Sequence, residues 1–265
     1  MKAVSRDSLE GRIALVTGGS RGVARGLAHA GCAVAVSYQR DAAAADKVVD
    51  DIREAGGRAI AVQATASDAE SWNSAVDIVE AKLGPVDLLV SNAGSASTGS
   101  TVLDTPLTEF GRLMDVHTFG PLALIQRLLP GMRAADRSDI VMISSAITSE
   151  APGRSAPYAM AKAAMECACR TLGREECQHA VHVNILAPGL MNTEMGARLV
   201  QASTNGGSLE DTAATGPFGF GTDLECYWER IWEQNTVKPI RTSETRRDRL
   251  DGGTRLTCNY ETECI

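Results

Sequence analysis

Three residues near the middle of the chain could together move a proton on or off a substrate oxygen. Tyr158 and Lys162 are four residues apart, a spacing that places both side chains on one face of a helix. Ser145 ends the apolar run 139–145, so a strand there would bring its hydroxyl to the same place. A phenol, an ammonium and a hydroxyl are the groups that acid–base chemistry on a carbonyl or alcohol uses. The Tyr-x-x-x-Lys spacing is common in helices, so its meaning depends on the elements around it.

Short apolar runs alternate with longer segments of helical periodicity over residues 13–186. Such runs are typical of strands that are buried on both faces, and the alternation predicts a parallel sheet covered by helices on both sides. We therefore expect an α/β, doubly wound, three-layer fold whose ligand site lies at the carboxyl ends of the strands. The expected strands are 13–17, 33–37, 59–63, 86–90, 140–143 and 181–186, and the expected helices are about 22–31, 41–55, 68–83, 107–134 and 157–178.

Length and composition limit the kinds of protein that this chain could be. Its 265 residues, of which 44% are hydrophobic, suffice for one domain over 1–265. The net charge of −7 argues against a nucleic-acid partner, and no apolar run approaches the roughly 20 residues of a membrane span. The N-terminus carries charges where a signal peptide needs an apolar stretch, and the seven cysteines lack CxxC spacing. We expect a cytoplasmic protein with reduced thiols and, because its four His lack ligand spacing, no metal.

A glycine-rich segment follows the first expected strand directly. Glycines at this place let the backbone approach a pyrophosphate, whose charge the amides at the start of the next helix would hold. A glycine-rich loop is often only a tight turn, but its position after the first strand of a βαβ unit favours dinucleotide binding. The residues expected around the pyrophosphate are Gly18, Gly19, Ser20, Arg21, Gly22 and Val23.

Five motifs occur in an order and spacing that identify a family. They are Thr17-Gly18-x-x-x-Gly22, Asn92-Ala93-Gly94, Ser145, Tyr158-x-x-x-Lys162 and Pro188-Gly189. In these motifs residues 10–195 resemble the short-chain dehydrogenase/reductase family, in particular the group that includes 3-oxoacyl-carrier-protein reductases. The resemblance implies a Rossmann-like sheet of seven parallel strands, binding of NAD(P), and interconversion of a ketone and a secondary alcohol.

The resemblance also implies a role for each matching residue. Tyr158 would protonate the carbonyl oxygen while the nicotinamide delivers hydride, and Lys162 would hold the cofactor ribose and favour the tyrosinate. Ser145 would hydrogen-bond the substrate oxygen; Ser144 is the alternative, but the distance of thirteen residues to Tyr158 fits Ser145. The further residues expected at the cofactor are Thr65, Ala66, Asn92, Ala93, Gly94, Pro188, Gly189, Leu190 and Thr193.

The end of the second expected strand bears on the choice of cofactor. Relatives that prefer NAD place an acidic residue there, which accepts a hydrogen bond from the ribose 2′-hydroxyl. Here Ser37 holds that place, Tyr38 and Arg40 follow, and Arg21 lies in the phosphate loop. Two guanidinium groups without a carboxylate suit a 2′-phosphate, although both could simply be solvated surface residues. We predict NADP(H).

Three residues within this part of the chain depart from the family pattern. Ala24 replaces the third glycine of the loop, and Thr65 replaces an Asp beside the adenine pocket. His117 stands where relatives carry an Asn that bends the central helix and anchors a water between the lysine and solvent. A His could take over this relay, because it exchanges protons near neutral pH, or it could be a passive helix residue. We count His117 among the candidate catalytic residues.

The chain beyond residue 195 resembles the family least. We expect 195–237 to form a flap over the substrate and 238–265 to form an abbreviated, irregular tail. A helix and most of the seventh strand are missing between 238 and 253, and in the family these elements form one of two dimer interfaces. We therefore expect a homodimer through the helices at 107–134 and 157–178 rather than a tetramer. The alternative function is a non-catalytic NADP(H)-binding sensor or scaffold.

Overall fold

The structure is a computed structural model that describes residues 9–18, 21–189, 247–250 and 253–256. The expected flap at 195–237 lies outside the described residues, as does most of the expected tail. In the described part, no helix is both long and apolar enough to cross a bilayer.

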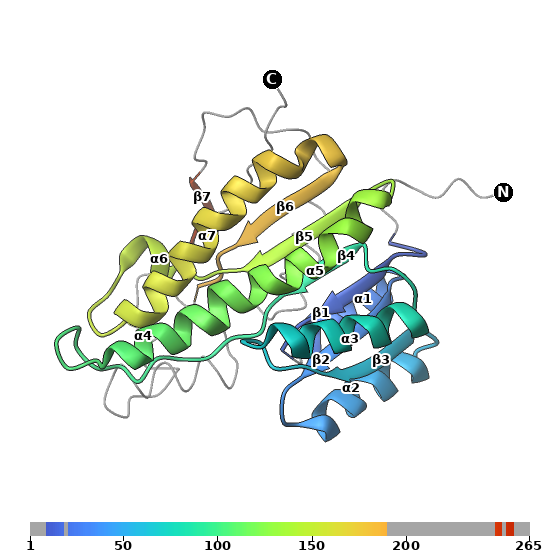
Figure 1. Cartoon of the computed structure of the whole chain (residues 1–265), viewed down its shortest axis with the longest axis horizontal. Helices are drawn as coiled ribbons and strands as arrows, with labels where there is room; N and C mark the ends of the chain where they lie inside the picture. The colour runs from blue at the N-terminus through green and yellow to red at the C-terminus, as the bar shows by residue number, and fades with distance from the viewer. Residues whose placement is uncertain (1–8, 19–20, 190–246, 251–252, 257–265) are drawn as a thin grey trace.

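The central layer is a parallel sheet (Figure 1). Its strands are β1 (Ile13–Val16), β2 (Ala33–Tyr38), β3 (Arg58–Gln63), β4 (Leu88–Ser91), β5 (Ser138–Ile143) and β6 (Val181–Leu186). They are ordered β3-β2-β1-β4-β5-β6, so the chain reverses its direction of travel across the sheet between β1 and β4. Ligands of doubly wound folds bind at such a switch point, beyond the carboxyl ends of the strands. The predicted fold class and all six expected strands are confirmed.

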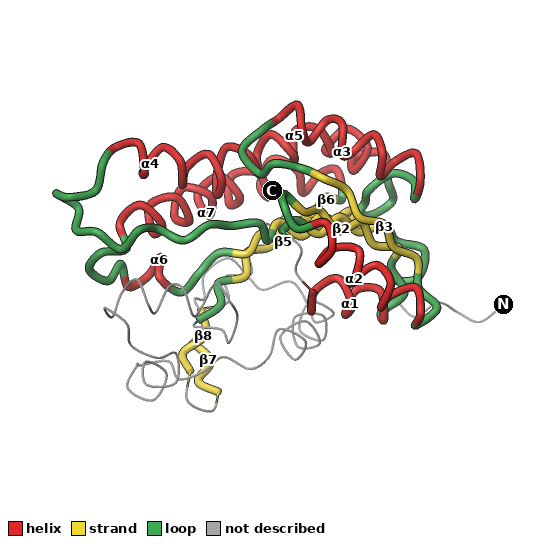
Figure 2. Tube along the Cα trace, turned by 90° about the horizontal axis from the view of Figure 1, so that it is seen from below, coloured by secondary structure: helices red, strands yellow, loops and turns green. Residues whose placement is uncertain are grey.

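Helices cover both faces of this sheet (Figure 2). One face carries α1 (Arg21–His29) and α2 (Ala42–Glu54), and the other carries α3 (Ala69–Lys82), α5 (Gly120–Ala134) and α7 (Ala156–Glu176). Aspartates begin two of them: the Asp41 carboxylate accepts from the Ala44 amide, and the Asp68 carboxylate accepts from the Glu70 amide. These contacts satisfy amides that have no partner within the helix.

The apolar runs form strands because both of their faces are buried. Leu15 belongs to the cluster on the side of α3, α5 and α7, which includes Leu124 and Met165. Its neighbour Val16 belongs to the cluster on the other side, which includes Val23. Alternate residues of one strand therefore enter opposite cores, which explains why the run is continuously apolar.

The helical segment expected at 107–134 is not one uniform helix. It consists of α4 (Leu107–Met114), a π-helical turn at Asp115–Phe119, and α5. A π-helical turn inserts one extra residue and changes which side chains face the neighbouring helix. Here it contains His117, which is turned into the protein and is buried.

The end of the chain does not extend the main sheet. β7 (Arg247–Leu250) and β8 (Gly253–Leu256) pair with each other in antiparallel register. Within the described residues, the parallel sheet thus has six strands rather than the seven that the resemblance implies, and β7 and β8 form a separate hairpin.

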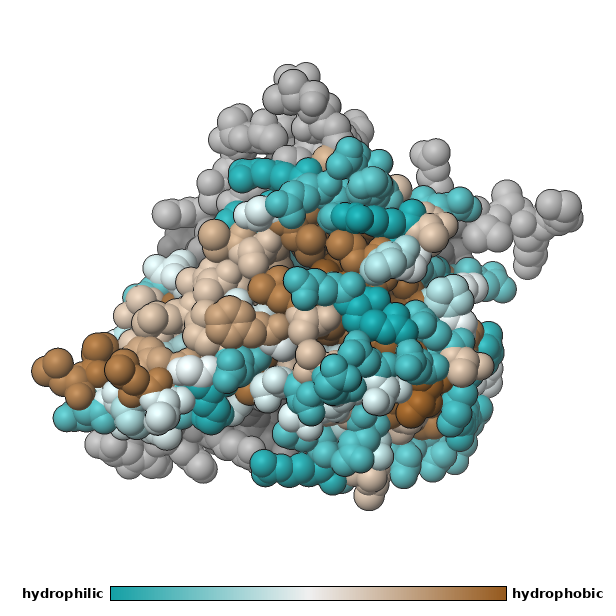
Figure 3. Space-filling model, in the orientation of Figure 1, coloured by the Kyte–Doolittle hydropathy of each residue, from teal (hydrophilic) through white to brown (hydrophobic). Residues whose placement is uncertain are grey.

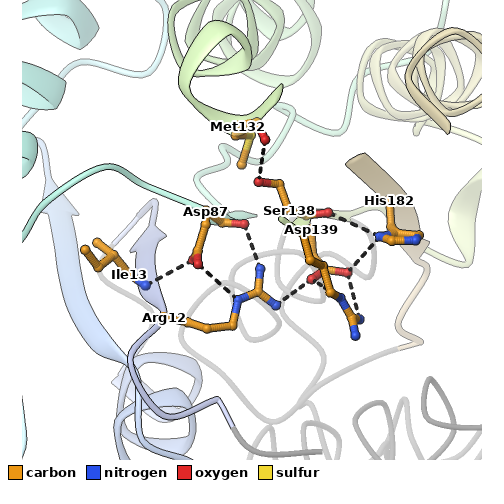
Figure 4. A network of polar contacts seen from close by, with 8 residues as sticks. Arg12, Ile13, Asp87, Met132, Ser138, Asp139 and His182 are labelled. Carbon is orange, nitrogen blue, oxygen red and sulfur yellow. Dashed lines mark hydrogen bonds and ion pairs between the residues drawn. The ribbon is translucent and has the colours of Figure 1, made fainter. Parts of the chain in front are cut away.

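An ion-pair network fastens the amino ends of three strands, at the edge opposite the carboxyl ends (Figure 4). Arg12 donates to the Asp139 carboxylate at 2.5 Å and to the Asp87 carbonyl oxygen at 2.8 Å. The Ile13 amide donates to the Asp87 carboxylate at 3.0 Å. Burial raises the pKa of Asp139, but hydrogen bonds from Arg137 and the charge of Arg12 outweigh it and hold that pKa below its usual value. The network therefore holds the amino ends of these strands together, at the edge of the sheet opposite the candidate site.

Candidate active site

Ser145, Tyr158 and Lys162 meet at the carboxyl end of β5. Lys162 Nζ donates to the carbonyl oxygen of Ile143, the last residue of this strand, at 2.5 Å. The same Nζ lies 5.8 Å from the centroid of the Tyr158 ring. The Ser145 hydroxyl lies near enough to the Tyr158 phenol to lower its pKa. The structure thus brings together the three groups that the sequence selected.

The neighbouring hydroxyls of Ser144 and Ser145 have different partners. Ser144 is buried, and its hydroxyl donates to the Glu166 carboxylate on α7. The Ser145 hydroxyl accepts from the Ile147 amide at 3.3 Å and faces Tyr158 instead. Ser145 is therefore the one of the two that is available to a substrate oxygen near the phenol.

Burial sets the charge states of Tyr158 and Lys162. It raises the pKa of Tyr158 to about 12, and the hydrogen bond with Ser145 opposes this change. It lowers the pKa of Lys162 to about 8, against the charge of Glu166, which raises it. At neutral pH the site therefore holds a protonated phenol beside a mostly cationic ammonium. A phenol that keeps its proton next to a cation is equipped to donate that proton to an oxyanion.

His117 contacts this cluster from the π-helical turn. Its ring meets the Tyr158 ring edge to face, with centroids 5.0 Å apart. Its Nε2 lies 2.8 Å from the Ser95 carbonyl oxygen and 3.2 Å from the Ser95 amide nitrogen. Among the buried side-chain nitrogen and oxygen atoms of the described residues, its Nδ1 is the one that lacks a hydrogen-bond partner.

The ionisation of His117 bears on the two alternatives that the sequence left open for it. Burial, reinforced by the charge of Lys162, lowers its pKa to about 3. The ring is thus a neutral imidazole at neutral pH, which favours the passive helix residue over the proton relay of the two alternatives that the sequence left open.

The segment after β4 is held against α4 as well as His117. The Arg112 guanidinium donates to the Ser95 hydroxyl at 2.8 Å and to the Ala96 carbonyl oxygen at 3.0 Å. The Glu109 carboxylate accepts from the Thr98 amide at 3.2 Å and pairs with Arg112. These hydrogen bonds thereby position the backbone segment 95–98 next to His117.

Thr17 joins the ends of β1 and β4 at the switch point. Its hydroxyl accepts from the amides of Asn92 at 3.0 Å and Ala93 at 2.9 Å, and its carbonyl oxygen accepts from the Asn92 side chain at 3.2 Å. Gly18 follows with a φ of +85°, and a Cβ there would lie 2.6 Å from the Ala93 Cα. Only glycine fits this close approach of the two strand ends, just before the start of α1.

The remaining residues of the glycine-rich segment are only partly described. Gly22 is half-buried at the start of α1, and Val23 is buried in the core, so only its backbone could touch a phosphate. Gly19 and Ser20 lie outside the described residues, and the side chain of Arg21 is not described.

The end of β2 presents no carboxylate. The Ser37 hydroxyl is buried and accepts from the Gly18 amide at 3.3 Å. Tyr38 is half-buried and Arg40 is exposed. In the part of the chain that the structure describes, Arg40 has no ion-pair partner within 4.0 Å. Its guanidinium is thus available to an anion.

The expected adenine side of the site is fixed by three contacts. The Ala66 carbonyl oxygen accepts from the Trp72 indole at 3.3 Å. Gly120 lies so close that a Cβ there would be 1.7 Å from the same oxygen. The Thr65 amide donates to the Ser71 hydroxyl at 2.9 Å. These contacts hold Thr65 and Ala66 between β3 and α3.

The end of β6 lies beside the Ser145 turn. The Ser144 amide donates to the Leu186 carbonyl oxygen at 2.6 Å, and the Ala146 amide donates to the Pro188 carbonyl oxygen at 2.8 Å. Pro188 is buried and Gly189 is exposed. Leu190 and Thr193 lie outside the described residues, and Asn92, Ala93 and Gly94 take the place expected for them after β4.

Sequence reasoning missed two polar residues of this region. The motif that contains Thr17 gives this residue no role of its own, although a hydroxyl at the end of an apolar run signals a link to a neighbouring strand. Glu166 belongs to none of the motifs, although it lies four residues after Lys162 and therefore on the same face of the helix.

Comparison with known proteins agrees with this geometry. A family model described as short chain dehydrogenase matches residues 12–204. A probable tetrahydroxynaphthalene reductase of Zymoseptoria tritici is 33% identical over 72% of this chain and 73% of its own length. An NADPH-dependent aldehyde reductase-like protein of Arabidopsis thaliana is 32% identical over 88% of this chain and 86% of its own. The crystal structure of a dehydrogenase/reductase from Sinorhizobium meliloti 1021 is similar, with a TM-score of 0.74 and 30% identity over 85% of this chain and 88% of its own.

Proposed function

The chain belongs to the short-chain dehydrogenase family, and we propose that within it the protein is an NADP(H)-dependent oxidoreductase that interconverts a ketone and a secondary alcohol. The observation that carries the proposal is the buried, protonated Tyr158 between the Ser145 hydroxyl and the Lys162 ammonium. This arrangement can stabilise and protonate an oxygen that becomes negative during hydride transfer.

Each of the three residues then has a defined task. Ser145 and Tyr158 donate hydrogen bonds to the carbonyl oxygen, which orients the substrate and stabilises the developing charge. Tyr158 transfers its phenolic proton to that oxygen. The Lys162 ammonium lies 5.8 Å from the centroid of the Tyr158 ring, and its positive charge stabilises the phenolate that remains after the proton is transferred. In the oxidative direction the same groups act in reverse.

The residues at the strand ends fit a nicotinamide dinucleotide. Gly18, which must be glycine because it lies against Ala93, precedes α1, and a pyrophosphate could bind at the amides that begin this helix. When bound, the cofactor would supply or accept the hydride. Exposed Arg40 and the absence of a carboxylate among Ser37, Tyr38 and Arg40 favour the 2′-phosphate of NADP(H) over NAD(H). The printed name of the Arabidopsis relative, which specifies NADPH, supports the same choice.

We further propose that two copies associate through α4, α5 and α7. Leu107 on α4, Phe119 in the π-helical turn between α4 and α5, and Met160 on α7 are exposed apolar side chains. Figure 3 shows apolar surface over this side of the molecule.

A substrate screen tests the proposed function. Purified protein is mixed with NADPH or NADH and a panel of cyclic, aromatic and aliphatic ketones, and the loss of reduced cofactor is followed by absorbance. We expect turnover of at least one ketone with NADPH and slower turnover with NADH. Tight NADPH binding without oxidation on any substrate would favour the alternative of a sensor or scaffold.

A further inference from the structure

The carboxylate of Glu166 joins two hydroxyl groups beside the proposed site. Glu166 lies one helical turn beyond Lys162 on α7, so both side chains are on the same face. The Ser144 hydroxyl donates to Glu166 Oε1, and the Thr148 hydroxyl lies 3.0 Å from the same oxygen. The Glu166 side chain is only 16% exposed to solvent, and a guanidinium nitrogen of Arg170 lies 3.6 Å from its Oε2. This carboxylate is thus built into the interior contacts of the site.

The two hydroxyls flank Ser145 in the chain. The Ser144 amide pairs with β6, and the Thr148 hydroxyl also lies 3.0 Å from the Ser145 carbonyl oxygen. The Glu166 carboxylate thereby holds both sides of the short turn that leads from β5 into α6 (Ile147–Glu150). Since Ser145 lies within this turn, the carboxylate fixes the direction in which its hydroxyl points.

Glu166 also acts on Lys162 through its charge. Burial of the ammonium lowers its pKa to about 8, and the negative charge of Glu166, followed by Cys169, opposes this effect. The other groups recorded around Lys162 are the Ile143 carbonyl oxygen, the Tyr158 ring and the neutral His117 ring. Of these groups, Glu166 is the carboxylate that can offset the loss of hydration.

We propose that Glu166 is a positioning residue of this site, because its carboxylate holds the turn that carries Ser145 and lies one helical turn from Lys162, on whose charge it acts. The inference rests on the proposed function only for its effect on turnover, since the charge of Lys162 can be measured without any substrate.

A titration of Lys162 tests the electrostatic part. The protein is isotope-labelled at the Cε of lysine, and the NMR signal that disappears in Lys162→Met reports the charge of Lys162. In Glu166→Gln, which keeps the shape but removes the charge, this signal should titrate about one pH unit lower than in the wild type. Glu175→Gln removes a charge from the exposed end of the same helix and should leave the titration unchanged.

Kinetics test the positioning part. Glu166→Asp keeps the charge but withdraws it from the two hydroxyls, so it should lower kcat about tenfold and leave the Lys162 titration nearly in place. As the pH rises, Glu166→Gln should lose its ketone-reducing activity at a lower pH than the wild type, because its Lys162 gives up its proton at a lower pH.

The outcomes separate this inference from the proposed function. An unchanged Lys162 titration in Glu166→Gln, or an equal shift in Glu175→Gln, would overturn it. An unchanged kcat in Glu166→Asp overturns the positioning role even if Glu166→Gln does not fold. A shifted titration in a protein that reduces no ketone would support the electrostatic part and contradict the proposed function instead.

Discussion

The imidazole of His117 meets the phenol of Tyr158 edge to face, with ring centroids 5.0 Å apart and an interplanar angle of 89°. The contact exists because a π-helical turn directs His117 inward, where its pKa falls to about 3 through burial and the charge of Lys162. A buried neutral ring next to the phenol excludes water from one side of it without adding a second cation.

Acidification should destabilise the protein through His117. The folded-state pKa of about 3 is below the ordinary value of 6.5, so between these values only the unfolded chain takes up the proton. The stability that the neutral ring contributes is complete above pH 6.5 and is lost as the pH falls toward 3. The slope from this group is about 1.4 kcal/mol per pH unit.

Urea unfolding of the wild type and His117→Asn at several pH values within this window measures the effect. We expect the free energy of unfolding to fall less steeply with decreasing pH in the variant. Parallel pH profiles for the two proteins would show that His117 is not buried in the neutral form.

Gly18→Ala should disrupt the cofactor site. Its φ of +85° disfavours a side chain, and the new Cβ would lie 2.6 Å from the Ala93 Cα. Gly56→Ala is a matched control, because Gly56 has the same φ of +85° but nothing within 4 Å of the added Cβ. We expect Gly56→Ala to cost about 1 kcal/mol of stability and to keep NADPH affinity. Gly18→Ala should cost more and weaken NADPH binding at least about tenfold; equal behaviour of the two variants in a fluorescence titration would contradict the proposed phosphate site.

Arg40→Glu should change the cofactor preference. It replaces an exposed cation at the end of β2 with the acidic group that would repel a 2′-phosphate and accept from a ribose hydroxyl. We expect the ratio of kcat/KM for NADPH over NADH to fall at least about tenfold. Arg58→Glu makes the same charge change at the exposed amino end of β3 and should leave the ratio unaltered. If both variants lower the ratio alike, the effect is one of overall charge and the assignment of Arg40 is wrong.

Removal of the two serine hydroxyls should have unequal effects. Ser145→Ala takes away the donor that faces Tyr158, and we expect kcat to fall about a hundredfold. Ser144→Ala removes only the contact with Glu166 and should lower kcat about tenfold or less. Steady-state rates on any ketone that the screen identifies compare the two variants, and a larger loss in Ser144→Ala would reverse the assignment.

The sequence predicted the sheet well because its strands are buried on both faces, which leaves a continuous apolar signal at runs such as β1. It did not predict the π-helical turn around His117, because one inserted residue changes the apolar periodicity of a long helix very little. The neutrality of His117 and the pairing of Ser144 with Glu166 arise from burial between elements that are far apart in the chain. Spacing could indicate the candidate triad, but only packing could establish its charge states.

The substitution Tyr158→Phe tests the central claim most directly, because it removes only the phenolic oxygen from a buried ring. NADPH affinity, measured by fluorescence, and ketone reduction are compared in the wild type and the variant. We predict affinity within about twofold of the wild type and a fall in kcat of at least about a hundredfold. Unchanged turnover with unchanged NADPH binding would contradict the assignment of Tyr158 as the proton donor.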